Sequence, residues 1–293
     1  NKFSSMFGQV LQIFSKRDFY STVKETGAQK GAKGFSSWDQ FVSMLFCHLG
    51  QARSLWEISG GFASCLGKLK HPGMNFARST LAYANEKKTW KLYESVFYQL
   101  LGKVQKIAPG KRKFRFKNKL FSLDATLMEL CLSLFDWATC HQTKGPVKLH
   151  LLLDHDGYFP VFARITDALT HEMRVARILS LPKGSIVEDV GHDLFARWLN
   201  EGVFFVSRQR VNASCTVIEE RPAPKKRSVL KDQLMTLSYC YSKKDYPHPF
   251  RRIEVTEEVS VVFVTNHLKF GATTIAAIYR DRWQIEIFFK TLK

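Results

Sequence analysis

Three features are missing from this sequence of 293 residues, and each absence excludes a class of protein. No two of the six cysteines form a C-x-x-C pair, which argues against a zinc site or a disulfide framework and favours free thiols in a reducing compartment. The longest nearly apolar runs, such as residues 41–49, are too short to span a bilayer. The amino end lacks the charged and then apolar segments of a signal peptide. We therefore expect a cytoplasmic protein with no membrane partner.

Acidic residues are also scarce relative to basic ones. Asp and Glu number 26 against 44 Lys and Arg, which gives a formal net charge of +18. Hydrophobic residues make up 45% and aromatic residues 13%, so the chain can bury a core and is not a disordered basic tail. A folded protein with such an excess of positive charge is expected to bind a polyanion, and nucleic acid is the leading candidate.

The positive charge is spread over the whole chain. Residues 1–108 and residues 109–293 each carry a net charge of +9. Basic residues are densest at residues 111–119 and around the prolines of residues 221–227. Phosphate contacts at these two patches would make binding fall steeply with salt, although each patch alone is equally compatible with an ordinary solvated surface.

The pair Pro109-Gly110 divides the chain into two parts. Residues 1–109 are predicted to be helical, and apolar residues at helical spacing predict a long helix over residues 89–107. Capping boxes at residues 37–40 and 54–57 predict two further helix starts, and the second of these helices is expected to end at Gly60-Gly61. We interpret residues 1–109 as a DNA-binding domain, with a packing cap for the rest of the chain as the alternative.

Residues 110–293 alternate between short apolar strands and helices, which predicts a mixed α/β sheet. The predicted strands are residues 120–123, 130–135, 147–153, 158–165, 185–187, 203–207 and 259–265. The predicted helices are residues 171–179, 193–200 and 273–293. Residues 211–258 mix strand and loop signals with many charges, and we interpret them as an insertion into the sheet.

Three acidic residues occupy positions where a metal site would need them. Asp124 and Asp189 each end a predicted strand, and Glu286 lies in the last helix. Ligands of open α/β sheets bind beyond strand ends, so these carboxylates can converge on Mg²⁺, although either aspartate alone is more often a turn former. Glu188 precedes Asp189, but strand alternation places it on the opposite face. The histidines and aspartates of residues 150–156 lie across a strand and its turn, so we expect them to diverge.

The last helix carries its charged groups on one stripe. At 100° per residue, Tyr279, Arg282, Glu286 and Lys293 fall within about 60° of one another. An acid flanked by two cations and a phenol is suited to holding a metal ion beside phosphate groups. An ordinary surface helix with an Arg282–Glu286 ion pair is the simpler alternative.

The spacing Tyr-(2)-Arg-(3)-Glu-(6)-Lys at residues 279–293 resembles the signature of the insertion-sequence-four family of bacterial DDE transposases. Similar stretches are Leu-Asp-Ala-Thr around Asp124, residues 143–150, and Phe-Val-Thr-Asn at residues 263–266. The resemblance covers essentially the whole chain. It implies an α/β, ribonuclease-H-like core with a mostly β insertion, preceded by an all-helical amino-terminal domain.

The resemblance also implies an activity. A DDE transposase cleaves DNA at the ends of its element and transfers the freed 3′-hydroxyl into target DNA. The implied catalytic residues, which are also the implied ligands of two Mg²⁺ ions (Mn²⁺ can substitute), are Asp124, Asp189 and Glu286. The implied DNA-binding residues are Tyr279, Arg282 and Lys293. The implied partners are double-stranded DNA, both terminal inverted repeats and target, and a second copy of the chain in a homodimer at the bacterial nucleoid.

The second motif of the sequence departs from the family pattern. Residues 189–192 read Asp-Val-Gly-His, where the family usually has Asp-Arg-Gly-Tyr, so a cation and a phenol are missing beside one acid. Family members continue past Lys293, and the sequence does not begin with Met, so the resemblance implies truncation at both ends with part of the core missing. Two alternatives therefore stay open: a catalytically degenerate transposase that only binds DNA, and a different ribonuclease-H-like nuclease.

Overall fold

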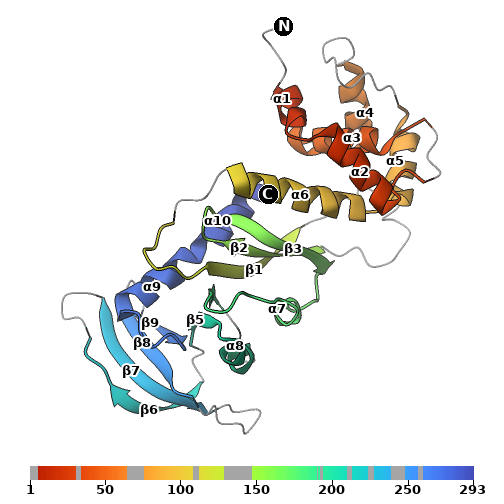
Figure 1. Cartoon of the computed structure of the whole chain (residues 1–293). Helices are drawn as coiled ribbons and strands as arrows, with labels where there is room; N and C mark the ends of the chain where they lie inside the picture. Colours follow the sequence, from red (N-terminus) through yellow and green to blue (C-terminus); the bar gives the residue numbers. More distant parts are fainter. Residues whose placement is uncertain are drawn as a thin grey trace. The chain divides into compact units, whose positions relative to one another are not determined.

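The computed structural model describes residues 6–30, 34–64, 76–107, 112–128, 147–189, 191, 194–209, 213–223, 228–238, 248–256 and 260–293. These residues form two compact units, of which the first contains described residues up to 107 and the second contains residues 112–128 and the described residues from 147 onward (Figure 1). Among the described helices, none combines the length and the apolar character needed to cross a membrane.

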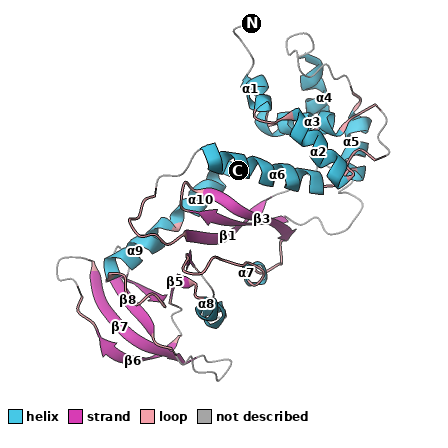
Figure 2. Cartoon of the chain, viewed as in Figure 1, coloured by secondary structure: helices cyan, strands magenta, loops and turns pink. Residues whose placement is uncertain are grey.

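The described part of the first unit consists of helices and their connections (Figure 2). The helices are α1 (Met6–Gln12), α2 (Lys16–Thr26), α3 (Ser37–Leu49), α4 (Leu55–Ser64), α5 (Arg78–Lys87) and α6 (Lys91–Ile107). Aromatic side chains fill their shared core, with Phe19, Phe41 and Phe62 all buried. The helix predicted over residues 89–107 agrees with α6 to within two residues.

Two predicted helix ends in this unit are wrong. The first capping box starts at Ser36 instead of Ser37, and Asp39 closes it by accepting a hydrogen bond from the Ser36 N–H. Helix α4 continues through Gly60-Gly61 instead of ending there. A Cβ added to the second of these glycines would lie 2.8 Å from the Phe46 ring of α3. The glycine therefore serves close helix packing and not helix termination.

The described residues of the second unit contain a nine-stranded sheet of order β3-β2-β1-β4-β5-β9-β8-β7-β6. The strands are β1 (Leu120–Met128), β2 (Val147–Asp154), β3 (Phe159–Asp167), β4 (Ile186–Glu188), β5 (Phe204–Arg208), β6 (Ser214–Glu220), β7 (Val229–Ser238), β8 (Phe250–Thr256) and β9 (Ser260–Thr265). Strands β1, β4 and β5 run parallel, and the other neighbouring pairs are antiparallel. The sheet is therefore mixed, as predicted.

The segment 211–258, interpreted as an insertion, contains β6, β7 and β8 among its described residues. These three strands continue the sheet beyond β9 and form its twisted outer part (Figure 1). The strand predicted over residues 130–135 lies outside the described residues.

Helices pack against both faces of the central strands. They are α7 (Glu172–Ala176) and α8 (Phe195–Glu201) on one face, and α9 (Ala272–Asp281) and α10 (Trp283–Leu292) on the other. The strand residues that share a core with α7 and α8 are Phe121, Val187 and Phe205. Their chain neighbours, which share a core with α9, are Leu120, Ile186 and Val206. Burial on both faces explains why these strands read as continuous apolar runs.

The last helix is interrupted at Arg282, so the prediction of one continuous helix over residues 273–293 is wrong. Helix α9 ends at Asp281 and α10 begins at Trp283. Arg282 keeps helical dihedral angles, φ −48° and ψ −35°, but its N–H bonds to the carbonyl of Tyr279, three residues back. The interruption is a tightened turn of the 3₁₀ type, and hydrophobic periodicity does not register such a local change.

Candidate active site

Asp124 lies in the middle of β1, and not at the end of a strand as predicted. Strand β1 pairs with β2 as far as Met128, whereas β4 pairs only with Leu120–Ser122 on the other side. Beyond Ser122, β1 has no partner strand on that side within the described part of the chain. Asp124 lies in this stretch with its side chain 25% exposed, and its Oδ1 accepts a hydrogen bond of 2.8 Å from the N–H of Ala125.

Asp189 directly follows β4 and adopts a left-handed backbone conformation, with φ +55°. Asp is among the few residue types that tolerate this conformation. Its N–H donates to the carbonyl of Val206 at 3.0 Å, which ties the strand end to β5. The side chain of Asp189 is 43% exposed, whereas that of Glu188 is fully buried. The two neighbouring acids therefore differ sharply in their access to solvent, and because Asp189 lies beyond the end of β4 in a left-handed conformation, strand alternation does not apply to it.

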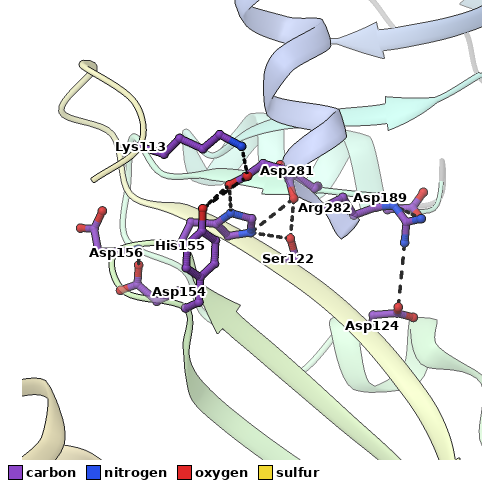
Figure 3. A network of polar contacts seen from close by, with 11 residues as sticks. Lys113, Ser122, Asp124, Asp154, His155, Asp156, Asp189, Asp281 and Arg282 are labelled. Carbon is purple, nitrogen blue, oxygen red and sulfur yellow. Dashed lines mark hydrogen bonds and ion pairs between the residues drawn. The ribbon is translucent and has the colours of Figure 1, made fainter. Parts of the chain in front are cut away.

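The guanidinium of Arg282 faces all three predicted acids. Its Nη2 lies 2.7 Å from Glu286 Oε1. Its Nε lies 3.6 Å from Asp189 Oδ2, and its Nη1 lies 3.9 Å from Asp124 Oδ2 (Figure 3). Each nitrogen thus faces a different carboxylate. The structure brings together acids from β1, from the end of β4 and from α10, which are far apart in the sequence.

The partly buried environment changes the pKa values of these groups. Burial, with a smaller contribution from the nearby Glu172 carboxylate, raises the pKa of Asp124 to about 6. Burial alone would lower the pKa of Arg282, but the negative charge of Asp189 and its neighbours raises it overall. A firmly charged guanidinium therefore balances a group of acids, at least one of which resists ionisation.

The other two residues of the sequence signature are less closely tied to the acids. The ring of Tyr279 packs on Phe263 of β9 with centroids 4.7 Å apart, and Arg282 Cζ lies 5.7 Å from the centroid of Tyr279. Lys293 is exposed at the last position, and no ion pair joins it to the acids within the described residues. Tyr279 therefore borders the site through Arg282, whereas Lys293 stands apart from it.

The donor set of the site is chemically suited to a hard divalent cation, because carboxylate oxygens are the ligands that Mg²⁺ prefers. The three carboxylates are, however, spaced around the guanidinium of Arg282 and not around a single point between them. Among the described residues, no group of three or more His, Cys, Asp or Glu side chains is close enough to hold an ion. An ion at this site would therefore compete with Arg282 for the same oxygens.

A second polar cluster, which sequence reasoning missed, adjoins the site (Figure 3). Ser122 Oγ contacts Glu188 Oε2 and lies 2.6 Å from His155 Nε2. His155 Nδ1 lies 2.6 Å from Asp281 Oδ2, and Lys113 Nζ donates to Asp281 Oδ1 at 2.5 Å. We call these five residues the buried network after its four buried members, because the side chain of the fifth, Lys113, is 54% exposed. The two residues of each contact lie more than thirty positions apart in the sequence. The only feature of the sequence that could have indicated the network is that Glu188 and Asp281 are direct neighbours of the site residues Asp189 and Arg282.

Burial dominates the chemistry of this network. The side chains of Glu188 and Asp281 are fully buried, and that of His155 is 2% exposed. Burial raises the pKa of Glu188 well above its usual value. Burial acts in the same direction on Asp281, but hydrogen bonds from His155 and Lys113 hold the pKa of this carboxyl below its usual value. Asp281 is therefore a stable anion inside the protein.

Comparison with known protein families assigns most of the chain to one family. Residues 115–293 match the transposase DDE domain family, and residues 2–75 match a domain of unknown function. The chain therefore belongs to the transposase DDE domain family.

Two transposases are among the relatives of the chain. It is 28% identical over 224 residues to a putative transposase of Sinorhizobium fredii, which covers 73% of the chain and 61% of the relative. It is 24% identical over 191 residues to a probable transposase for an insertion sequence element of Geobacillus stearothermophilus, which covers 62% of the chain and 50% of the relative. The chain thus spans about half to three-fifths of the length of these relatives.

Proposed function

We propose that the chain acts as a DNA transposase, which cleaves DNA at the ends of a mobile element and transfers the freed 3′ end into target DNA. The observation that carries the proposal is the convergence of Asp124, Asp189 and Glu286 on one guanidinium. Membership of the transposase DDE domain family and the names of the two relatives support the reaction class.

We also propose a ribonuclease-H-like core of the insertion-sequence-four type. The order β3-β2-β1-β4-β5, in which an antiparallel meander continues into parallel strands, supports this fold. The β-rich segment between Asp189 and Glu286 is consistent with the insertion that the resemblance implies. The packing of Arg282 beside Tyr279 supports assignment of the family signature.

In the proposed mechanism, Asp124, Asp189 and Glu286 would hold two Mg²⁺ ions, or Mn²⁺ in their place, and such ions would supply polarisation of a phosphodiester. Arg282 balances the acids in the protein alone and binds a DNA phosphate when the acids hold another cation. The hydroxyl of Tyr279 donates to a phosphate oxygen beside Arg282. Lys293 contacts the DNA backbone from the end of α10.

The net charge of +18 supports double-stranded DNA as the partner, both the terminal inverted repeats and the target. Residues 1–109 are proposed to form a DNA-binding domain. Large exposed aromatic side chains on this part, among them Trp56, Tyr83 and Trp90, accompany its excess of basic residues. Such a combination is typical of nucleic-acid interfaces. A homodimer would pair the two transposon ends at the bacterial nucleoid.

A strand-cleavage assay tests the proposed activity. The substrate is a DNA fragment that carries the inverted repeats flanking the gene, and the buffer contains Mn²⁺. Wild-type protein is expected to cut at the repeat ends, and Asp124→Ala is expected to lower the rate by about 10³-fold or more, because a catalytic metal site contributes several kcal/mol. Glu201→Gln, on the surface of α8, is the control and should retain the wild-type rate. Equal rates for wild type and Asp124→Ala would refute the catalytic assignment.

The motif at residues 189–192 favours a second candidate function, that of a DNA-binding protein derived from a transposase and lacking catalysis. Val190 and His192 lie outside the described residues. Specific binding to the repeats in a gel-shift experiment, without cleavage by wild type, would support this candidate. Cleavage that ignores the repeat sequence would instead support another ribonuclease-H-like nuclease.

A further inference from the structure

We propose that the buried network is a positioning device that holds β1, β4 and the α9–α10 junction so that the site residues of these three segments meet. The inference rests on the proposed function in one respect, namely that Asp124, Asp189 and Glu286 bind metal ions. The members that we assign as positioning residues are Lys113, Ser122, His155, Glu188 and Asp281.

Each of the three segments contributes one side chain to the network and a nearby one to the site (Figure 3). The pairs, with the network residue first, are Ser122 and Asp124 on β1, Glu188 and Asp189 at the end of β4, and Asp281 and Arg282 at the helix junction. Because the two members of a pair are at most two residues apart, a constraint on the first limits the movement of the second.

The contact between Ser122 and Glu188 closes the ladder between β1 and β4. These two residues are register partners in the parallel pairing, and they form its last pair. Their side chains also touch, because Ser122 Oγ hydrogen-bonds to Glu188 Oε2. The two strands are therefore joined through both backbone and side chains immediately before Asp124 and Asp189 reach the site.

Asp281 holds the helix junction in the same way. It accepts hydrogen bonds from Lys113 Nζ at 2.5 Å and from the Tyr158 hydroxyl at 3.1 Å, and its Oδ2 lies 2.6 Å from His155 Nδ1. His155 and Tyr158 belong to the turn between β2 and β3, where Tyr158 has φ +58°, a conformation rare for bulky residues. Contacts from two separate segments thus fix the residue before Arg282, and a rotation there would carry the guanidinium away from the acids.

The order Ser122–His155–Asp281 matches that of a hydrolase triad, but burial excludes nucleophilic catalysis. Ser122 has no exposed surface, and His155 is 3% exposed. The Ser122 hydroxyl donates its hydrogen bond to Glu188 Oε2, so its proton is directed at this carboxylate and not at His155, as a triad would require. These contacts therefore serve structure and not acyl transfer.

A buried ion pair between strands β7 and β8, outside the network, provides a matched control. Asp232 on β7 is a buried carboxylate that binds Arg251 of β8, with distances of 2.7 Å to Nε and 2.5 Å to Nη2. Asp281→Asn and Asp232→Asn each replace a buried, ion-paired carboxylate with an amide of the same shape. Both variants lose a charge inside the same unit, but only the first touches the network.

The measurement is Mn²⁺ affinity in the absence of DNA, from the electron paramagnetic resonance signal of the free ion. The comparison is made in an Arg282→Gln background, because there the guanidinium no longer competes with Mn²⁺ for the acids. In that background Asp281→Asn is expected to weaken binding roughly 10-fold or more, as loss of residues that orient metal ligands usually does. Asp232→Asn should stay within about two-fold of the Arg282→Gln parent. Equal weakening by both variants, or none by Asp281→Asn, would overturn the proposal.

In the wild-type background the release of Arg282 from the acids would itself favour Mn²⁺, so Asp281→Asn is expected to weaken Mn²⁺ binding less there than in the Arg282→Gln background. Should Asp281→Asn fail to fold, Lys113→Met takes its place, because the Lys113 side chain is 54% exposed and its loss opens no core cavity. Weaker Mn²⁺ binding by this variant supports the proposal, and unchanged binding contradicts it.

A crystal structure of Asp281→Asn gives a readout that needs neither metal nor catalysis. The guanidinium of Arg282 is expected to leave Asp124, Asp189 and Glu286, and unchanged contacts would overturn the inference. Wild-type protein that binds Mn²⁺ through these acids but cuts no DNA would refute only the proposed function. The two ideas therefore fail by different observations.

Discussion

The candidate active site and the buried network are neighbouring charged clusters that differ in how easily their members can exchange partners. In the site, three carboxylates with 25%, 43% and 28% exposed side chains share one guanidinium at distances of up to 3.9 Å. In the network, the acidic and histidine side chains are at most 2% exposed. A buried group that loses its partner keeps its desolvation cost, whereas an exposed one regains water. The site can therefore trade Arg282 for another cation, while the network cannot rearrange without destabilising the fold.

The largest expected difference between the two clusters is in stability. His155→Ala is expected to lower the free energy of unfolding by about 3–5 kcal/mol, because it leaves Asp281 and Ser122 buried without a shared partner. Asp189→Asn, in the site, is expected to change it by less than about 0.5 kcal/mol, since Asn tolerates the left-handed conformation and the carboxylate that it replaces is partly solvated. Urea denaturation followed by circular dichroism measures both. Similar losses in the free energy of unfolding for the two variants would contradict the proposed difference between the site and the buried network.

A smaller effect is expected from the cation of the site. Arg282→Gln should tighten Mn²⁺ binding roughly 5- to 10-fold, because it removes a competitor whose interaction with the acids is on the order of 1 kcal/mol. The same change is expected to slow DNA cleavage, since a phosphate contact is lost. Titration with Mn²⁺ and the cleavage assay give the two values.

The control for this variant is Arg197→Gln, which removes a partly exposed arginine that binds Glu201 on α8 and the carbonyls of Arg177 and Leu179. It should alter neither Mn²⁺ affinity nor cleavage. Weaker Mn²⁺ binding by Arg282→Gln would show that the guanidinium assembles the acids and does not compete for them.

Elements with a strong local pattern were predictable from the sequence. The β-branched run of β9 and the amphipathic helix α6 both lie within about two residues of their predicted bounds. Elements whose ends depend on tertiary contacts were not. Gly60-Gly61 looks like a helix end until Phe46 is seen packed against it, and Asp124 looks like a strand end until β2 is seen paired beyond it.

Sequence reasoning was similarly divided on the site. The spacing of Tyr279, Arg282 and Glu286 pointed to one helix face, and the structure places Arg282 among acids from other elements. Nothing in the local sequence around His155 indicated its contact with Asp281, because the two lie 126 positions apart. A single sequence shows which residues share an element but not which elements meet. The predicted assignment of Asp124, Asp189 and Glu286 as metal ligands stays a prediction.

The smallest effect is expected at the loop that carries Asp189. A Cβ added to Gly191 would lie 2.4 Å from Sδ of Met173 on α7, so the loop or the methionine must move. Since a Met side chain is flexible, Gly191→Ala is expected to cost only about 1 kcal/mol of stability. Displacement of Asp189 should nevertheless lower the cleavage rate several-fold, because the distance to Arg282 is already 3.6 Å.

Two comparison variants separate this displacement from a general effect of adding a methyl group. In the double variant Gly191→Ala/Met173→Ala the space is restored, so cleavage should recover although the smaller side chain lowers stability further. Gly60→Ala adds a methyl group with no atom within 4 Å and should not slow cleavage. Recovery of the cleavage rate in the double variant would mean that the contact between the added methyl group and Met173 had displaced Asp189. Failure to recover would contradict the steric explanation, because Gly191 does not have a left-handed backbone conformation that alanine would strain.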